Sequence, residues 1–224
     1  MIREIYARSL GMLMKQPVRL WGLSLLGGFL TFLGNVFFGI IPAAGVAISW
    51  LLTVGMVGIY VRGIHGEEVY AVQLFDAFRD WKTIKRVLAG TGWAALWVFL
   101  WALIPVVGII FALVKAYSYQ LVPYILLYEP EVAPTDAIKV SAERTMGYKG
   151  KLFWADVLPV VLYVVAVLIF WLCSNIPGVG VVFNILGAVV SILFCLLLPL
   201  FLGLVGAMFY EKLTPAPEAQ TEEE

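Results

Sequence analysis

The sequence predicts an all-α membrane protein in which six transmembrane helices form three hairpins, each preceded by an amphipathic cytoplasmic helix. Hydrophobic residues make up 62% of the chain and charged residues 13%, with a mean hydropathy of +0.95. Soluble domains have about 45–50% apolar and about 25% charged residues, so lipid is the expected solvent here. The pattern Ile-Pro-x-x-Gly recurs at residues 41–45, 104–108 and 176–180, each time between two long apolar runs. These uncharged turns predict the hairpins.

The basic residues predict how the hairpins are oriented. All fifteen lysines and arginines except Lys115 fall in four blocks outside the turns, at residues 3–19, 62–86, 139–151 and 212. Cytoplasmic segments of membrane proteins carry an excess of these residues. Both termini are therefore expected in the cytoplasm and the three turns outside. The expected location is the cytoplasmic (inner) membrane, crossed several times.

The length of the chain fits one membrane domain. Its 224 residues have room for about six spans of ~20 residues with short connections. Amphipathic segments are expected before the first, third and fifth spans. The expected spans lie at about residues 21–41, 43–61, 87 or 91 to 104, 108–128, 152–175 and 178–209.

Single residues predict where several helices end. Pro17 is expected to end a short surface helix over residues 1–19. A second surface helix is expected between residues 62 and 90. A third surface helix is expected before the fifth span. Thr135 is expected to cap its N-terminus, and Gly147 to end it. The sixth span would be about 48 Å long if fully helical, so Pro199 is expected to kink it or to mark where its end leaves the bilayer.

The chain is expected to form one domain over residues 1–213, followed by an acidic tail over 214–224 that is rich in Pro and Glu and expected to be disordered. Within the domain an internal threefold repeat is predicted, with units 1–62, 63–128 and 129–213. Each unit has the same order of basic amphipathic segment, span, turn and span. Turns that arose independently would produce a similar pattern.

A few polar side chains within apolar runs are the candidate functional residues. Lys115 stands apart from the basic blocks, and a lysine facing lipid near the middle of a bilayer costs at least about 2.5 kcal/mol. One interpretation is an intramembrane site for an ion, a proton or an anionic substrate. The other is that Lys115 extends to the outer headgroups. The candidate site comprises Lys115, Tyr117, Ser118, Gln120, Asp156 and Asn184.

Each candidate also has a structural interpretation. Asp156 is expected to pair with Lys149 or Lys151 at the inner interface, or to accept a hydrogen bond from a nearby amide, because its estimated depth differs from that of Lys115 by about 10 Å. Buried amides such as Asn184 commonly hydrogen-bond between helices. Three tryptophans spaced four apart on one face of the third span are expected to pack against neighbouring helices rather than to bind a cofactor.

Motifs for several reactions are missing from the sequence. It contains no phosphate-binding G-x-x-x-x-G-K-[ST] loop, no G-x-S-x-G elbow and no H-E-x-x-H pair. His65 is the sole histidine, so a zinc site lacks ligands, and Ser141 has no histidine nearby in the sequence. The sequence therefore predicts a protein that is not an enzyme, has no cofactor or metal, and does not bind nucleic acid.

Residues 117–153 resemble a broad superfamily of prokaryotic integral membrane proteins of unknown function, which includes the membrane domain attached to some glycerophosphodiester phosphodiesterases. The lead into the first span at residues 13–21 is similar as well. The resemblance implies a six-helix membrane domain without an established catalytic site; phosphodiesterase chemistry would belong to a separate soluble domain. The residues that carry it are Tyr124, Glu129-Pro130, Ala137, Ser141, Thr145, Gly147, Leu152-Phe153 and Phe209-Tyr210-Glu211.

The expected function is a structural or interaction module in the membrane. Its expected partners are membrane lipid, other membrane proteins or further copies of itself. The alternative is a small transporter or channel with a polar path around Lys115, Gln120 and Asp156.

Overall fold

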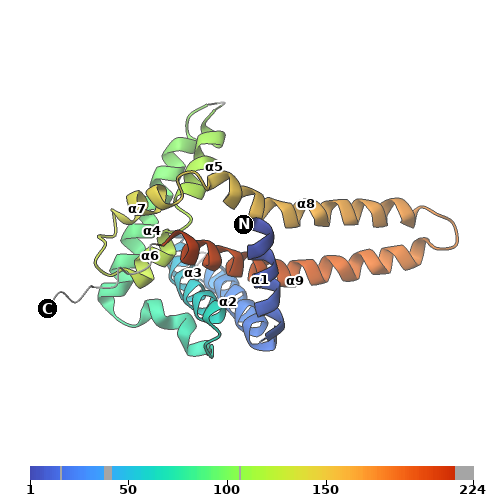
Figure 1. The fold of residues 1–224 in the computed structure, drawn as a ribbon, viewed down its shortest axis with the longest axis horizontal. Helices are drawn as coiled ribbons and strands as arrows, with labels where there is room; N and C mark the ends of the chain where they lie inside the picture. Colours follow the sequence, from blue (N-terminus) through green and yellow to red (C-terminus); the bar gives the residue numbers. More distant parts are fainter. Residues whose placement is uncertain (16, 38–41, 106, 215–224) are drawn as a thin grey trace.

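The structure is a computed structural model that describes residues 1–15, 17–37, 42–105 and 107–214, and its regular elements there are all helices (Figure 1). In chain order they are α1 (Ile2–Lys15), α2 (Pro17–Phe37), α3 (Pro42–His65), the 3-10 helix η1 (Ala71–Phe78), α4 (Trp81–Ala102), α5 (Gly108–Ser118), α6 (Val122–Tyr128), α7 (Ala137–Arg144), α8 (Lys149–Ser174) and α9 (Gly180–Leu213). Residues 38–41, at the end of the predicted first span, and the predicted tail beyond Thr214 lie outside this description.

Five helical stretches in the described ranges are long and apolar enough to cross a membrane. Helix α4 contains the predicted third span and is not among them, because its first turns carry lysine and arginine. The five are Arg19–Phe37, Ala43–His65, Gly108–Tyr128, Lys149–Ser174 and Gly180–Leu213. The third of these is interrupted between α5 and α6 at residues 119–121.

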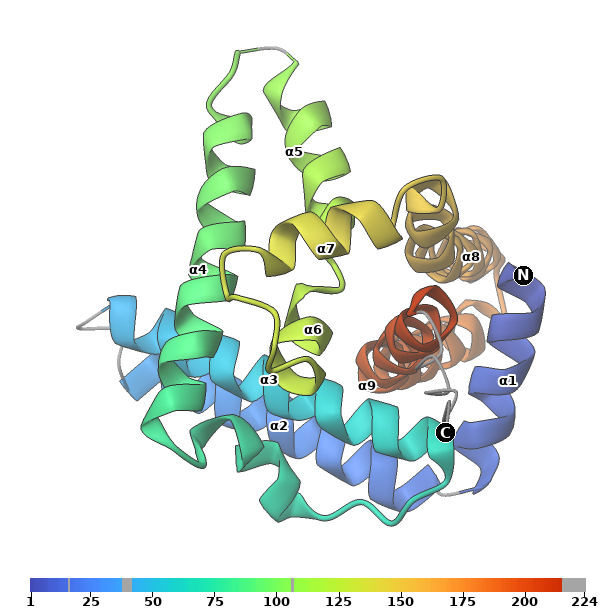
Figure 2. The same ribbon diagram turned by 60° about the vertical axis from the view of Figure 1, so that its left-hand side comes forward.

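The long helices pack as three pairs, α2 with α3, α4 with α5 and α8 with α9. The pairs point in different directions. In Figure 1 the α8–α9 pair extends to the right and the α4–α5 pair points upward. In Figure 2 α2 and α3 run across the view below α4 and α5. A single flat bilayer does not hold all three pairs along its normal in this arrangement.

The core lies where the C-terminal halves of α3 and α9 meet the short helix α6. Ile59 of α3, Ile125 of α6 and Phe209 of α9 each have 0% of their surface exposed. The rings of Tyr124 and Tyr210 stack with their centroids 4.9 Å apart. Burial of large apolar and aromatic side chains is the main favourable contribution to folding, so this centre joins the three pairs into one domain.

Helix α9 changes its surroundings at Pro199. Its 34 residues span about 50 Å. On the N-terminal side of Pro199, Val181 and Ile192 are 73% and 60% exposed, whereas Leu204 is fully buried at 0% and Tyr210 nearly so at 8%. Pro199 was expected to kink the span or to mark its exit from lipid; it lies within the continuous helix where an exposed half becomes a buried half.

The prediction of a separate surface helix over residues 62–90 was wrong. Its apolar positions fall in two elements, η1 and α4, and α4 continues from Trp81 through the predicted third span. The break has a local cause. The carboxylate of Asp80 accepts hydrogen bonds from the backbone N–H and the hydroxyl of Thr83 at 2.7 and 2.8 Å, which caps the start of α4.

The N-cap of α7 lies one residue after the predicted one. Asp136 occupies the N-cap position that was expected for Thr135, and its carboxylate accepts from Lys139 at 2.8 Å instead of from a backbone N–H. Gly147 has a φ of +78°, a conformation that glycine adopts at little cost. It separates α7 from α8, as the sequence predicts.

Two of the three Ile-Pro-x-x-Gly copies start a helix at their glycine. A Cβ atom would lie 2.5 Å from the Trp101 carbonyl oxygen at Gly108, and 2.2 Å from the Ser174 carbonyl oxygen at Gly180. Only glycine permits so close an approach to the end of the preceding helix. In the first copy α3 begins at Pro42 itself, so the first copy differs from the other two.

We predict that Gly55→Ala destabilises the protein by about 2–3 kcal/mol, because overpacking against a rigid neighbour is costly. A Cβ at Gly55 would lie 2.0 Å from the backbone oxygen of Leu74 in η1. Gly28→Ala is the matched control: no atom lies within 4 Å of its Cβ position, and alanine favours a helix by up to about 1 kcal/mol. Thermal unfolding in detergent checks this; equal melting temperatures would contradict it.

Candidate functional site

Part of the predicted polar site is assembled where α8 passes the connection between α5 and α6. The carboxylate of Asp156 accepts a hydrogen bond from the Gln120 side-chain amide at 3.2 Å, and the Tyr117 hydroxyl approaches the same carboxylate. The amide oxygen of Gln120 is buried and has no partner among the described residues. The contact with Gln120 agrees with the expectation that Asp156 accepts from a nearby amide. The alternative, a pairing with Lys149 or Lys151, is absent from the ion pairs of the described residues.

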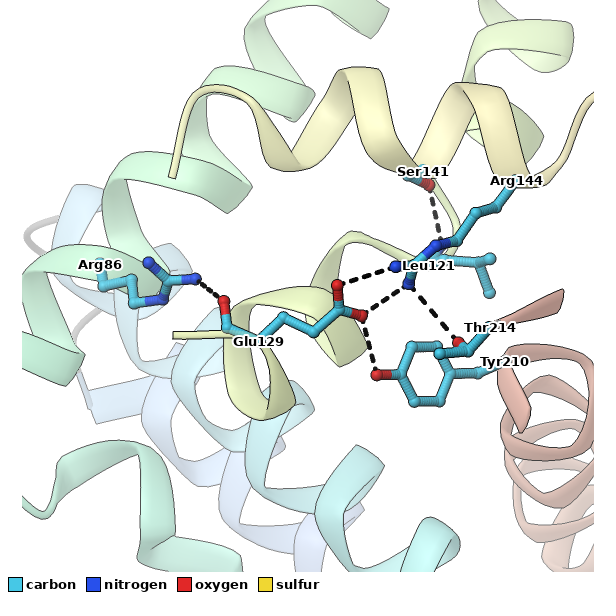
Figure 3. Close-up of polar contacts among 7 residues, drawn as sticks. All are labelled: Arg86, Leu121, Glu129, Ser141, Arg144, Tyr210 and Thr214. Carbon is cyan, nitrogen blue, oxygen red and sulfur yellow. Dashed lines mark hydrogen bonds and ion pairs between the residues drawn. The ribbon is translucent and has the colours of Figure 1, made fainter. Parts of the chain in front are cut away.

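Ser118 has a different role. Its hydroxyl donates to the carbonyl of Val114 at 2.7 Å. Its own carbonyl accepts from the hydroxyls of Ser141 at 2.7 Å and Thr145 at 3.3 Å. The Ser141 oxygen also accepts from the backbone N–H of Leu121 at 3.3 Å, drawn in Figure 3. These bonds attach α7 to the end of α5, and they occupy the Ser141 hydroxyl with backbone groups.

Lys115 and Asn184 lie away from Asp156. The ammonium of Lys115 is 5.5 Å from the centroid of the Trp101 ring, and Lys115 lines a groove that it shares with residues 135–139. Asn184 is exposed in the second turn of α9, a part of the helix that runs beside α8. The structure therefore divides the six predicted residues among four places.

A second polar cluster joins α6, α7 and α9 (Figure 3), and we call it the hub network: Arg86, Glu129, Arg144, Tyr210 and Thr214. Arg144 donates to both carboxylate oxygens of Glu129, at 2.6 and 2.8 Å. The Tyr210 hydroxyl donates to Glu129 at 3.0 Å, and Arg144 reaches the Thr214 hydroxyl at 3.5 Å. The side chains of Arg144 and Glu129 are only 16% and 21% exposed.

The surroundings of Glu129 shift its pKa in opposing directions. Burial raises the pKa, but hydrogen bonds from Arg144 and Tyr210 and the positive charges of Arg144 and Arg86 outweigh it and hold the pKa of Glu129 below its ordinary value. The carboxylate in turn raises the pKa of the Arg144 guanidinium. A two-pronged bond between a guanidinium and a carboxylate is among the strongest polar contacts in proteins, so both groups stay charged at neutral pH.

Arg86 brings α4 into the same cluster. Its guanidinium donates to the backbone carbonyls of Leu126 at 3.1 Å and Glu129 at 2.5 Å. These carbonyls lie at the C-terminal end of α6. The last carbonyls of a helix have no hydrogen-bond partners within it, and they attract positive charge. On the other side, Arg62 of α3 pairs with Asp76 of η1 at 2.8 Å. With Arg86, the hub network joins four helices, α4, α6, α7 and α9.

Sequence reasoning missed the hub network as a set of contacts, although the resemblance had included Glu129, Ser141, Thr145 and Tyr210. One signal was available for Arg144. It follows Ala137 and Ser141 by seven and three residues, which places all three on one face of a helix. Because the other two are buried at 0%, that face is the inner one. Nothing in the spacing gives the partner of Arg144, which lies on another helix.

The sole histidine lies outside the polar clusters described above. His65 ends α3, and its imidazole lies 3.6 Å from Glu211. No group of three His, Cys, Asp or Glu side chains that would hold a metal ion occurs in the described ranges. The best-formed polar clusters consist of groups that satisfy one another, which favours a structural role for them.

The comparisons with known proteins add no relative: no family model, no curated protein and no solved structure matches this chain.

We predict that Glu129→Gln lowers the free energy of unfolding by about 2–3 kcal/mol, because removing one partner of a buried ion pair leaves the other charge uncompensated. Asp136→Asn is the control, since Asp136 and Lys139 form an exposed pair, with 49% and 73% of their side chains accessible. Such pairs contribute at most about 1 kcal/mol. Chemical or thermal unfolding in detergent measures both; similar losses in the two variants would contradict a central role for Glu129.

The lowered pKa of Glu129 also predicts a pH dependence. Its stabilising effect is complete above the unfolded pKa of about 4.3 and is lost as the pH falls through the lower folded pKa, because the folded state must then take up a proton. The melting temperature of the wild type should fall more steeply than that of Glu129→Gln below about pH 5. Parallel curves for the two proteins would show that Glu129 does not titrate in this way.

Proposed function

We propose that this chain is a non-enzymatic, multi-pass protein of the cytoplasmic membrane that acts as a structural or interaction module for lipid or for partner membrane proteins. The observation that carries the proposal is the surface of the outer arm, residues 157–198 of α8 and α9. In the most apolar stretch of α8, 0% of the residues are buried within the protein. In that of α9, 6% are. Exposed apolar patches beyond a few hundred Å² mark contact with a membrane or a partner.

The character of the outer arm supports lipid or a partner helix as its environment. Large apolar side chains are exposed on both helices, including Trp171 at 62%, Leu172 at 62% and Ile185 at 60%. A helical backbone pairs most of its own polar groups, which is what hydrocarbon requires of a spanning segment. With 26 and 34 residues, each helix exceeds the ~20 residues that a bilayer needs.

The hub network supports a structural rather than a catalytic role. Its carboxylate is held by a guanidinium and a phenol, and the nearby Ser141 hydroxyl is engaged by backbone groups. A nucleophile or general base needs a partner poised to exchange protons with it. We also propose the family suggested by the resemblance, because Glu129, Ser141 and Tyr210 from its pattern share this centre.

We propose six crossings with both termini and all basic blocks in the cytoplasm. The support is that the charged clusters lie at the inner ends of the helix pairs while the turns at the far ends are uncharged. Because the three pairs diverge (Figures 1 and 2), this topology requires the α2–α3 and α4–α5 pairs to turn toward the direction of the outer arm in a bilayer.

Single cysteines, introduced after replacement of the two native ones, test this topology with a membrane-impermeant thiol reagent. His65→Cys and Met146→Cys should react only after the cells are opened, since both lie in cytoplasmic segments; these side chains are 47% and 68% exposed. Leu103→Cys and Ile176→Cys, at 60% and 50% exposure near two turns, should react in intact cells. Opposite-side labelling of His65→Cys and Met146→Cys would overturn the six-crossing scheme.

One observation favours the alternative, a small transporter. A groove of about 420 Å³ lies between α2, α3, α6 and α9, and Gln120, the partner of Asp156, lines it. Liposomes that contain the purified protein separate the two functions. Substrate-dependent flux that Lys115→Leu or Asp156→Asn abolishes would replace the module by a transporter.

A further inference from the structure

We propose that a groove on the α4–α5 pair binds one acidic phospholipid, with the ammonium of Lys115 on its phosphate and a row of tryptophans along its acyl chains. The inference rests on the proposed function, since it names the ligand of a lipid-binding module. We call this site the aromatic groove; its volume is about 360 Å³, and it is lined by Trp93, Trp97, Trp101, Lys115, Tyr119, Thr135, Asp136, Ile138 and Lys139.

Lys115 provides the charge. Within the described ranges it forms no ion pair. Its ammonium lies 5.5 Å from the centroid of the Trp101 ring. The side chain is partly shielded from solvent, where an unpaired ammonium next to hydrocarbon is costly. An anion beside it would remove that cost. The other lysine of the groove, Lys139, is already bound to Asp136 at 2.8 Å, so the lining has a net positive charge that resides on Lys115.

The tryptophans provide the apolar wall. Trp93 and Trp97 are 37% and 38% exposed, and their rings meet edge to face with centroids 6.0 Å apart. Trp101 in turn packs against Phe111 at 5.5 Å. The prediction that these residues pack against neighbouring helices describes them only in part, because they keep an open face. Indole rings favour the region between headgroups and acyl chains, which suits a lipid rather than a soluble anion.

The position of the groove fits a headgroup. One wall belongs to the apolar helices α4 and α5, and the other is the polar segment 135–139 that leads into α7. The sequence placed Lys115 in the outer half of a span, and the structure places it beside the polar segment that carries Asp136 and Lys139. Basic pockets between membrane helices bind the headgroups of anionic lipids. The matching ligand has a phosphate monoanion joined to two acyl chains.

The test uses the full chain in bilayers of phosphatidylcholine, with brominated phosphatidylglycerol as a quencher of tryptophan fluorescence. The wild type should bind the acidic lipid selectively. Lys115→Gln should weaken that binding about tenfold, the effect expected for one charge-assisted hydrogen bond. Lys85→Gln is the matched control, because Lys85 also lies over a tryptophan, 5.4 Å from the ring of Trp81, and has no place in the groove.

Each outcome is decisive. Equal loss in Lys115→Gln and Lys85→Gln, or no loss in either, would overturn the site, and displacement of the lipid by inorganic phosphate would assign the groove to a soluble anion. An unchanged melting temperature of Lys115→Gln shows that this variant is folded. If Lys115→Gln does not fold, the Trp97→Leu variant is tested in its place. It must then lose the preference for the acidic lipid, or the site is refuted. Failure here with Leu103→Cys still labelled from outside leaves the proposed function intact, whereas cytoplasmic labelling of Leu103→Cys removes the basis of that function's topology.

Discussion

The ion pair between Glu129 and Arg144 is the contact on which the arrangement of the helices depends. It joins the end of α6 to α7, and through Tyr210 it also holds α9. Arg86 adds α4 by binding the backbone of the same turn. Each group would be costly to bury alone, but together they satisfy one another. The pair therefore fixes where three helices meet, a task that apolar packing alone leaves less specific.

The apolar core and the outer arm divide the chain into two kinds of helical surface. Around Tyr124 and Phe209 side chains are buried inside the protein, whereas α8 beyond its first turns contacts little except α9. Helices that bury so little within their own chain leave a large apolar surface for lipid or a partner helix. Pro199 stands at the boundary between the two, and the same helix serves both surfaces.

The sequence was sufficient for the helical class, the apolar helices and the stop at Gly147, because composition and local spacing determine them. It was insufficient for the break at Asp80, where a side-chain cap overrides a continuous apolar period. It also gave no partner for Arg144, and it grouped Lys115 with Gln120. Such errors have one physical cause: spacing gives the face of a helix, but the partner across that face is set by packing between distant segments.

The position of Lys115 shows how this limit bears on function. Counted along a straight span, it lies in the outer half and invites comparison with intramembrane ion sites. The chain, however, turns at residues 119–121 between α5 and α6, which shortens α5 and brings α7 against it. Lys115 then faces tryptophans and the segment before α7 instead of Asp156. A lysine in that setting has the neighbours that suit a lipid headgroup as ligand, and the bond between Ser141 and the Ser118 carbonyl helps to hold α7 there.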